Sequence, residues 1–171
     1  TIHPAINPLA LQNAEVPPET VAALVRTFGI DPERPLMLQV ALLEERPDLP
    51  SLVEIYRLCK TRVPTLQLAL VDASGSREAT YLRSVLRRVG DDPDVSLLPS
   101  RRGVGAMEIN ALQRIAVTVQ RTLYAGFSPP IADAQWKARP VVVGEIRNGS
   151  HQVLDSQTGL VAPNADVFVD H

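Results

Sequence analysis

Short apolar runs alternate along this chain with longer segments in which apolar residues recur every three to four positions. Five runs rich in leucine and valine are too short for helices and therefore predict buried strands. These runs lie at 36–41, 66–71, 95–98, 117–119 and 141–143. Segments with helical spacing lie before and between them, at 18–28, 51–63, 82–89, 107–116 and 130–137. This alternation predicts an α/β domain, a Rossmann-like doubly wound fold with a mostly parallel sheet and helices on both faces.

The domain organisation follows from where the periodic pattern begins. Residues 1–17 show no sustained period and are punctuated by prolines, which predicts an extended, proline-rich arm. Residues 18–171 then form a single Rossmann-like domain. Ligands of doubly wound domains bind outside the carboxyl ends of the strands, so we expect function in the loops after the strands. Those loops follow Ala41, Val71, Leu98 and Thr122.

The charge and hydropathy of the chain exclude several classes of partner. Hydrophobic residues make up 45% of the chain and charged residues 21%, a balance typical of a folded domain. The 17 basic and 19 acidic residues are dispersed, and the basic ones gather no further than the pairs Arg87-Arg88 and Arg101-Arg102, so we expect no nucleic-acid partner. The absence of a long apolar run predicts no membrane insertion, and with no visible signal peptide the expected location is cytoplasmic.

General catalytic and metal-binding motifs are scarce. Gly103 and Gly105 precede a helix, but the third glycine of a dinucleotide fingerprint is missing. The three histidines lie far apart in sequence, so we predict no metal site. Cys59, the single cysteine, lies on the apolar stripe of its helix, and we expect it to pack in the core. For Trp136 we expect a packing role rather than a role in binding.

Three segments carry a resemblance to a known family: Asn110–Arg114, Gly126–Phe127 and Trp136–Val142. With them, the chain resembles the family 4 retaining glycosyltransferases, and within that family the nucleotide-sugar-dependent trehalose synthase and trehalose phosphorylase subgroup. Segments 4–9, 29–35 and 90–94 resemble the subgroup in order and spacing. The resemblance implies two Rossmann-like domains with the active site between them, of which this chain is similar only to the C-terminal, donor-binding domain.

The resemblance also implies which residues would contact a nucleoside diphosphate sugar. The family places an arginine and a lysine on the leaving diphosphate, where negative charge develops, but these positions hold Leu42 and Pro47. Losing one such cation typically costs about 3 kcal/mol of transition-state stabilisation. Arg46 and Arg101, together with Arg102, are the substitutes available nearby, although each is equally compatible with a solvated surface position.

A second departure concerns a pair of glutamates that flank the glycine-phenylalanine turn in the family. The first position holds Ala125, which has no carboxylate, and the second holds Asp133, which is shorter by one methylene but could still bind a ribose. Pro129 and Pro130 remove backbone N–H donors that a phosphate could have used. Departures are thus concentrated where the donor would bind.

We therefore expect a donor-binding domain with a degenerate site, no resident cofactor and no residue in a catalytic role. A nucleoside diphosphate sugar is the ligand it would take. The donor-binding candidates are Asp133, Arg46, Arg101, Gly103, Gly105 and Gly126. Two alternatives stay open: hexosyl transfer with an N-terminal acceptor domain or a second chain, and a non-catalytic interaction or regulatory module, including a homo-oligomer.

Overall fold

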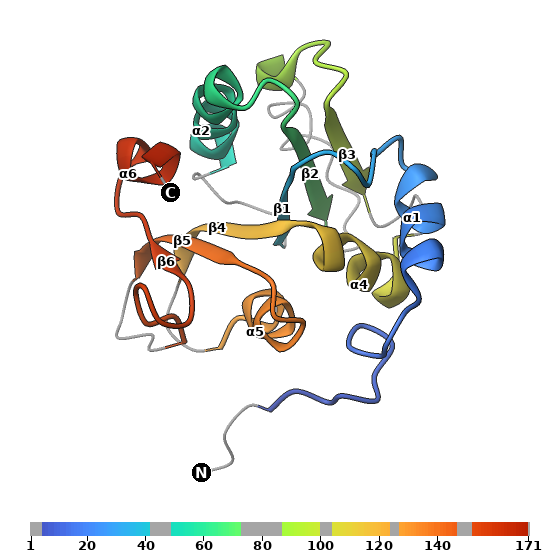
Figure 1. The fold of residues 1–171 in the computed structure, drawn as a ribbon. Coiled ribbons are helices and arrows are strands. Elements are labelled where there is room, and N and C mark those ends of the chain that lie inside the picture. The colour runs from blue at the N-terminus through green and yellow to red at the C-terminus, as the bar shows by residue number, and fades with distance from the viewer. Residues whose placement is uncertain are drawn as a thin grey trace.

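The six strands of the domain form one sheet in the order β3-β2-β1-β4-β5-β6 (Figure 1). The computed structural model describes residues 5–41, 49–72, 87–99, 104–123, 127–146 and 152–170. The strands are β1 (Leu36–Ala41), β2 (Gln67–Asp72), β3 (Val95–Pro99), β4 (Val117–Leu123), β5 (Val141–Ile146) and β6 (Leu160–Val161). Neighbouring strands pair in parallel throughout this sheet, which confirms the predicted fold class. The strand order is that of a doubly wound Rossmann-type sheet.

Helices cover both faces of the sheet (Figure 1). The helices are α1 (Pro18–Arg26), α2 (Leu49–Arg62), α4 (Ala106–Ile115), α5 (Pro129–Trp136) and α6 (Ala165–Asp170). One apolar cluster joins α2 and α6 to the sheet, and a second joins α1 and α4 to the opposite face. A smaller cluster seats α5 on β5.

The strands are apolar on both faces because both faces are covered. Along β2, Leu68 and Leu70 pack in the cluster of α2, whereas Ala69 and Val71 pack in the cluster of α4. All four side chains are at most 1% exposed. A continuous apolar run is the pattern expected of a buried parallel strand.

The C-terminal segment 152–170 contains structure that the sequence did not predict. β6 has two residues and α6 has six, so neither is long enough to show a clear period. The segment is nonetheless anchored, because Phe168 is 4% exposed in the cluster of α2. Elsewhere the helices and strands begin and end within a few residues of their predicted bounds, and of the helix predicted at 82–89 only residues 87–89 are described.

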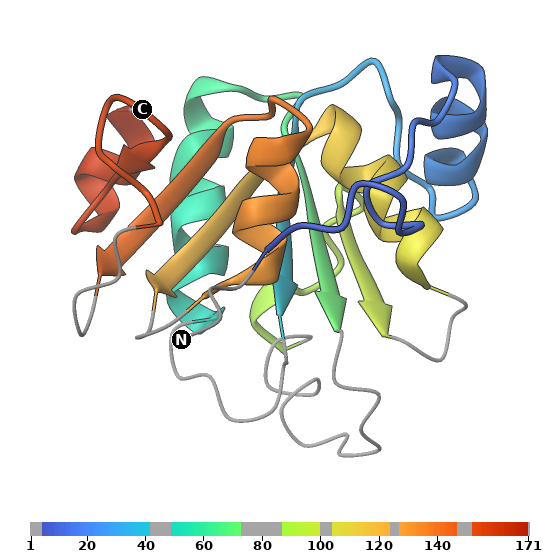
Figure 2. The ribbon, with the colours of Figure 1, turned by 90° about the horizontal axis from the view of Figure 1, so that it is seen from below.

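The arm, residues 5–17, lies against α4 and α5 rather than projecting away from the domain (Figure 2). It contains a turn in which the amides of Asn13 and Ala14 donate to the carbonyl of Ala10. Figure 2 also shows the arm starting on the side of the domain where the strands end.

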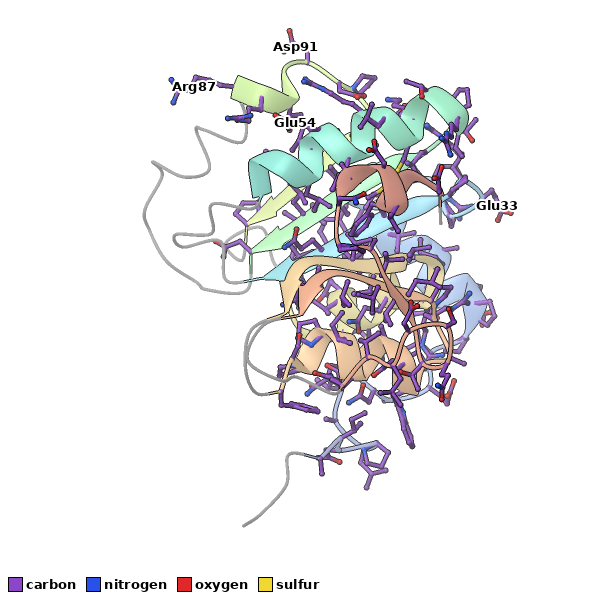
Figure 3. The ribbon with its side chains drawn as sticks, turned by 90° about the vertical axis from the view of Figure 1, so that its left-hand side faces the viewer. Glu33, Glu54, Arg87 and Asp91 are labelled. Atoms are coloured by element: carbon purple, nitrogen blue, oxygen red, sulfur yellow. The ribbon has the colours of Figure 1, made fainter. Side chains whose placement is uncertain are left out.

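Charged side chains of both signs are dispersed over the surface. In Figure 3, Glu33, Glu54, Arg87 and Asp91 point outward, and all four are exposed. No helix among the described residues is long and apolar enough to cross a bilayer.

Candidate functional site

The strand order reverses between β1 and β4, and this switch point is where a doubly wound sheet binds ligands. The segments that follow these two strands, 42–48 and 124–126, lie outside the described residues. Leu42, Arg46, Pro47, Ala125 and Gly126 lie in these segments. Arg101, Arg102 and Gly103, which follow β3, also lie outside the described part of the chain. At this edge the structure therefore places the beginnings of α4 and α5, with Gly105, Ser128 and Asp133.

The N-terminus of α4 is closed by a side chain of the same helix. The backbone N–H of Gly105, which immediately precedes α4, donates to Oε2 of Glu108 at 2.8 Å. This carboxylate brings its negative charge to the end of the helix where the helix dipole is positive. A helix N-terminus binds phosphate through free N–H groups and positive potential, and Glu108 reduces both here.

The N-terminus of α5 is also closed, by a residue distant in sequence. Pro129 and Pro130 begin the helix and carry no N–H groups. The N–H of Ser128 donates to Oε1 of Gln152 at 2.8 Å, and Nε2 of Gln152 donates to the carbonyl of Ser128 at 2.8 Å. The hydroxyl of Ser128 donates to Oε1 of Gln120 at 2.9 Å. At this turn the N–H of Ser128 is thus engaged, and the next two residues carry none.

Asp133 lies half-buried in the second turn of α5. Its backbone carbonyl accepts a hydrogen bond from Nζ of Lys137 at 3.1 Å. Desolvation lowers the pKa of Lys137 to about 8, an effect that the charge of Asp133 opposes and that of Arg114 adds to. The Asp133 carboxylate is therefore electrostatically coupled to Lys137.

A charged network lies at the opposite edge of the sheet, where the strands begin. Nζ of Lys60 is 2.8 Å from Oδ1 of Asp92 and 2.9 Å from Oδ2 of Asp94, and Asp94 also pairs with Arg34 at 2.8 Å. The hydroxyl of Tyr56 donates to Asp92, and its ring lies 5.3 Å from Nζ of Lys60.

The pKa values in this network fit a structural role. Burial opposes the charged form of Lys60, but hydrogen bonds to Asp92, Tyr56 and Asp94 raise its pKa, and the hydrogen bond from Lys60 lowers the pKa of Asp94. Segments 29–35 and 90–94, which helped to carry the family resemblance, therefore meet in ion pairs at the edge away from the switch point.

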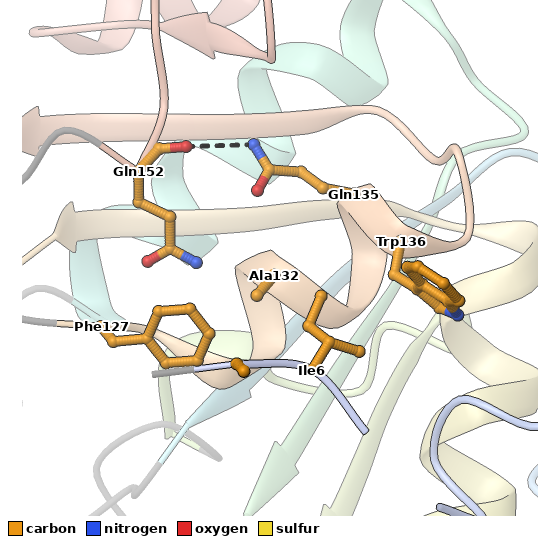
Figure 4. Close-up of a pocket in the computed structure, with 7 residues that line it drawn as sticks. Ile6, Phe127, Ala132, Gln135, Trp136 and Gln152 are labelled. Carbon is orange, nitrogen blue, oxygen red and sulfur yellow. Dashed lines mark hydrogen bonds between the residues drawn. The ribbon is translucent and has the colours of Figure 1, made fainter. Parts of the chain in front are cut away.

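An open groove of about 520 Å³ runs along the outer side of α5 (Figure 4). Phe127, Ala132 and Trp136 line it from α5 and the turn before it, and the start of the arm lines the other side. Trp136 is 53% exposed and Phe127 38% exposed. Trp136 was expected to have a packing role, but about half of its side chain is exposed, because its position near the end of α5 faces the groove and not the sheet.

Cys59 fulfils its predicted packing role. It is half-buried against the apolar cluster of α2, and desolvation raises the pKa of its thiol. A raised pKa disfavours the reactive thiolate. Within the described segments, no three side chains of His, Cys, Asp or Glu are grouped so that they could hold a metal ion.

The two residues that accept from the N–H groups before α4 and α5 were not predicted from the sequence. Glu108 is recognisable afterwards, since a glutamate three residues after a helix cap commonly hydrogen-bonds back to it. No sequence pattern indicated that Gln152 hydrogen-bonds at the start of α5, because its partner Ser128 lies 24 residues away.

The described architecture defines a class of fold, the doubly wound Rossmann-like domain, which solved glycosyltransferases share. A glycosyltransferase from Rickettsia africae superposes with a TM-score of 0.68 at 14% identity over 91% of this chain and 41% of that one. HepE from Anabaena, in complex with UDP-glucose, gives a TM-score of 0.67 at 18% identity over 91% of this chain and 42% of that one. No protein-family model matches the chain.

Sequence similarity adds a group of relatives to this likeness in fold. The trehalose synthase of Pyrococcus horikoshii is 32% identical over 171 residues, which is 98% of this chain and 41% of that protein. Over almost its whole length the chain is therefore similar in sequence to curated trehalose synthases, and it shares its fold with solved trehalose-phosphate synthases. It spans about two fifths of the length of the curated relatives that it matches.

Proposed function

We propose that this chain is the donor-binding domain of a trehalose synthase-like glycosyltransferase, with a degenerate nucleotide-sugar site. It binds nucleotide weakly or not at all and transfers no sugar by itself. The observation that carries the proposal is the loss of anion-binding donors at both helix N-termini of the switch-point edge. Glu108 accepts from the N–H that precedes α4, Gln152 accepts from the N–H that precedes α5, and two prolines begin α5.

The physical reason is the charge that a sugar diphosphate brings. Transfer of the sugar leaves a diphosphate whose negative charge must be stabilised by fixed cations or backbone donors. Leu42 and Pro47 carry no charge, Glu108 adds a negative one, and Ser128 has its N–H engaged. Because each missing group weakens transition-state binding, these losses together make catalysis very slow.

The alternative within the same class is active hexosyl transfer in a longer protein or a complex. In that case Asp133 binds the ribose, Arg46 or Arg101 approaches the diphosphate, and Gly103, Gly105 and Gly126 leave room for the donor. An acceptor domain, supplied by the same polypeptide or by a second chain, completes the cleft.

Calorimetric titration distinguishes a degenerate donor site from one that binds the nucleotide sugar for transfer. The purified chain is titrated, at low salt and without metal, with uridine, adenosine and guanosine diphosphates and with their glucose conjugates. The proposal predicts no saturable binding tighter than about 1 mM, with a cooperative melt showing that the protein is folded. Tighter binding that Arg46→Ala or Arg101→Ala abolishes, and that weakens as salt rises, would contradict it.

A second candidate function is a partner-binding module, and the groove on α5 favours it. An exposed tryptophan beside a phenylalanine in an apolar groove is typical of a protein interface. Trp136 is the only tryptophan in the chain, so its fluorescence reports on the groove directly.

The test is to titrate the chain with a separately produced acceptor domain and to follow tryptophan emission. Because burial moves an indole into apolar surroundings, docking over the groove shifts the emission to shorter wavelength. A tryptophan-free acceptor domain keeps the signal specific, and Leu154→Ser, on an exposed residue that does not line the groove, is the matched control. An unchanged spectrum while binding is detected by sedimentation would place the interface elsewhere.

A further inference from the structure

The arm is held to the domain by buried polar groups and only slightly by apolar packing. Leu9 and Leu11, two of its larger apolar side chains, are 89% and 59% exposed. Asn13, in contrast, is 3% exposed, and Val16 supplies a single buried apolar contact at 8%. The position of the arm must therefore be determined mainly by hydrogen bonds.

Asn110 on α4 binds the turn of the arm through its amide. Its Nδ2 donates to the carbonyls of Leu11 and Ala14, each at 2.8 Å, and the side chain is fully buried. Arg114, one turn later, donates from Nε to Oδ1 of Asn110 at 3.1 Å and from Nη2 to the carbonyl of Ala14 at 3.0 Å. These bonds fix both the amide plane of Asn110 and the backbone of the arm.

Lys137, at the end of α5, joins the arm to both helices. Its ammonium donates to Oδ1 of Asn13 at 3.1 Å, to Oε1 of Gln113 at 3.0 Å and to the carbonyl of Asp133 at 3.1 Å. Nε2 of Gln113 in turn donates to the carbonyl of Pro130 at 2.9 Å. The three donors of the ammonium are matched by one acceptor on the arm, one on α4 and one on α5.

We infer that Asn13, Asn110, Gln113, Arg114 and Lys137 form a clasp that makes residues 5–17 a fixed strap of this domain. The clasp sets the direction in which the chain enters, at the edge where the strands end. Residues 5–17 then contain no hinge between this domain and any other segment of polypeptide. The inference does not depend on nucleotide binding and would stand if the proposed function failed.

The clasp gives a physical meaning to two of the segments that carry the family resemblance. Asn110–Arg114 supplies three of its members, and Trp136–Val142 supplies Lys137. Buried polar groups stabilise a position only when they are fully paired, because an unpaired one costs the desolvation of the group. The clasp therefore forms only when these residue types are present together. Any other position of the arm would leave their buried polar groups unpaired.

Hydrogen exchange of the full chain tests the clasp, read at the amides of Asn13 and Ala14, which donate to Ala10. Lys137→Met keeps the length and apolar stem of the side chain but removes all three bonds. We expect it to raise exchange in the arm by about tenfold while the strands keep their protection. Lys60→Met is the matched control, since Lys60 is the half-buried lysine of the ion-pair network at the opposite edge.

A second variant protects the test against a folding defect. Asn13→Ala removes one acceptor from the arm and leaves α4 and α5 unchanged, so we expect faster exchange in the arm with an unaltered melting temperature of the domain. Arm amides that exchange at unstructured rates in the wild type would overturn the inference. So would arm protection that is the same in wild type, Lys137→Met and Asn13→Ala.

Discussion

Ala138 holds a backbone conformation that suits glycine better. It has a φ of 53° directly after α5, where the N–H of Ala138 donates to the carbonyl of Gln135 and that of Arg139 to the carbonyl of Ala134. This is the Schellman arrangement that ends many helices, and its left-handed residue is usually glycine. We predict that Ala138→Gly raises the free energy of unfolding by about 0.5–1 kcal/mol, as measured by urea denaturation.

Ala23→Gly is the control for this substitution. Ala23 is exposed within α1, where glycine only adds backbone freedom, so the free energy of unfolding should fall by about 0.5–1 kcal/mol. If both glycine variants lost stability equally, Ala138 would carry no left-handed strain.

Lys137 gives the fold a pH dependence with a definite sign. Desolvation lowers the pKa of its ammonium to about 8, whereas in the unfolded chain it returns to the ordinary value of 10.5. Between these values the unfolded state binds more protons, so the free energy of unfolding attributable to Lys137 rises as pH increases. It stays flat below pH 8, where both states are protonated.

Urea denaturation across this window, on wild type and on Lys137→Met, isolates the effect of Lys137. We expect the stability difference, wild type minus variant, to grow between pH 8 and 10.5. Tyr56, whose pKa burial raises, is present in both proteins and cancels in the difference. If the stability difference instead shrinks as pH rises, the fold raises the pKa of Lys137 and holds its ammonium in the charged form.

At the scale of elements, the short strand β6 depends on a glycine beside it. A Cβ on Gly159 would lie 2.9 Å from the carbonyl oxygen of Val141 and 2.9 Å from Cγ1 of Val153. The carbonyl belongs to β5 and cannot move without disturbing the sheet. We predict that Gly159→Ala lowers the free energy of unfolding by about 2 kcal/mol, measured by urea denaturation.

Gly29→Ala separates this steric clash from backbone strain. Gly29 has a φ of +77° and open space around its Cα, so alanine there costs only the left-handed conformation, about 1 kcal/mol. If Gly159→Ala lowers the free energy of unfolding less than Gly29→Ala does, β6 can move away from the added methyl group at little cost.

The sequence predicted the helices and strands whose apolar pattern is complete within one short segment. The runs in β1, β2 and β5 are mainly apolar because two helical layers cover them, and their alternation with helical segments indicated a parallel sheet. β6 and α6 were missed because they are too short for a period and are stabilised by tertiary packing, as Phe168 shows. The closure of α5 by Gln152 and the exposure of Trp136 depend on which side of the helix meets the rest of the fold, which spacing does not reveal.

At the scale of the whole molecule, the residues that preserve the family pattern serve the scaffold. Arg34 and Asp94 form an ion pair where the strands begin, while Asn110 and Lys137 hold the arm. The departures that we expect from the family pattern fall in sequence after β1 and β4, the two strands at the switch point. Under the proposed function, a retained scaffold with an altered site is what we expect of a domain that has lost its chemistry and kept its fold.

The most direct test of this account is a titration of the isotopically labelled chain with UDP-glucose, followed by the NMR resonances of the backbone amides of Gly105 and Ser128. These are the N–H groups that Glu108 and Gln152 engage. If Glu108 and Gln152 keep these N–H groups engaged, neither resonance moves in a saturable way at up to roughly 1 mM ligand. Saturable shifts of both amides, with a common dissociation constant, would show that the helix N-termini open to a diphosphate and would contradict it.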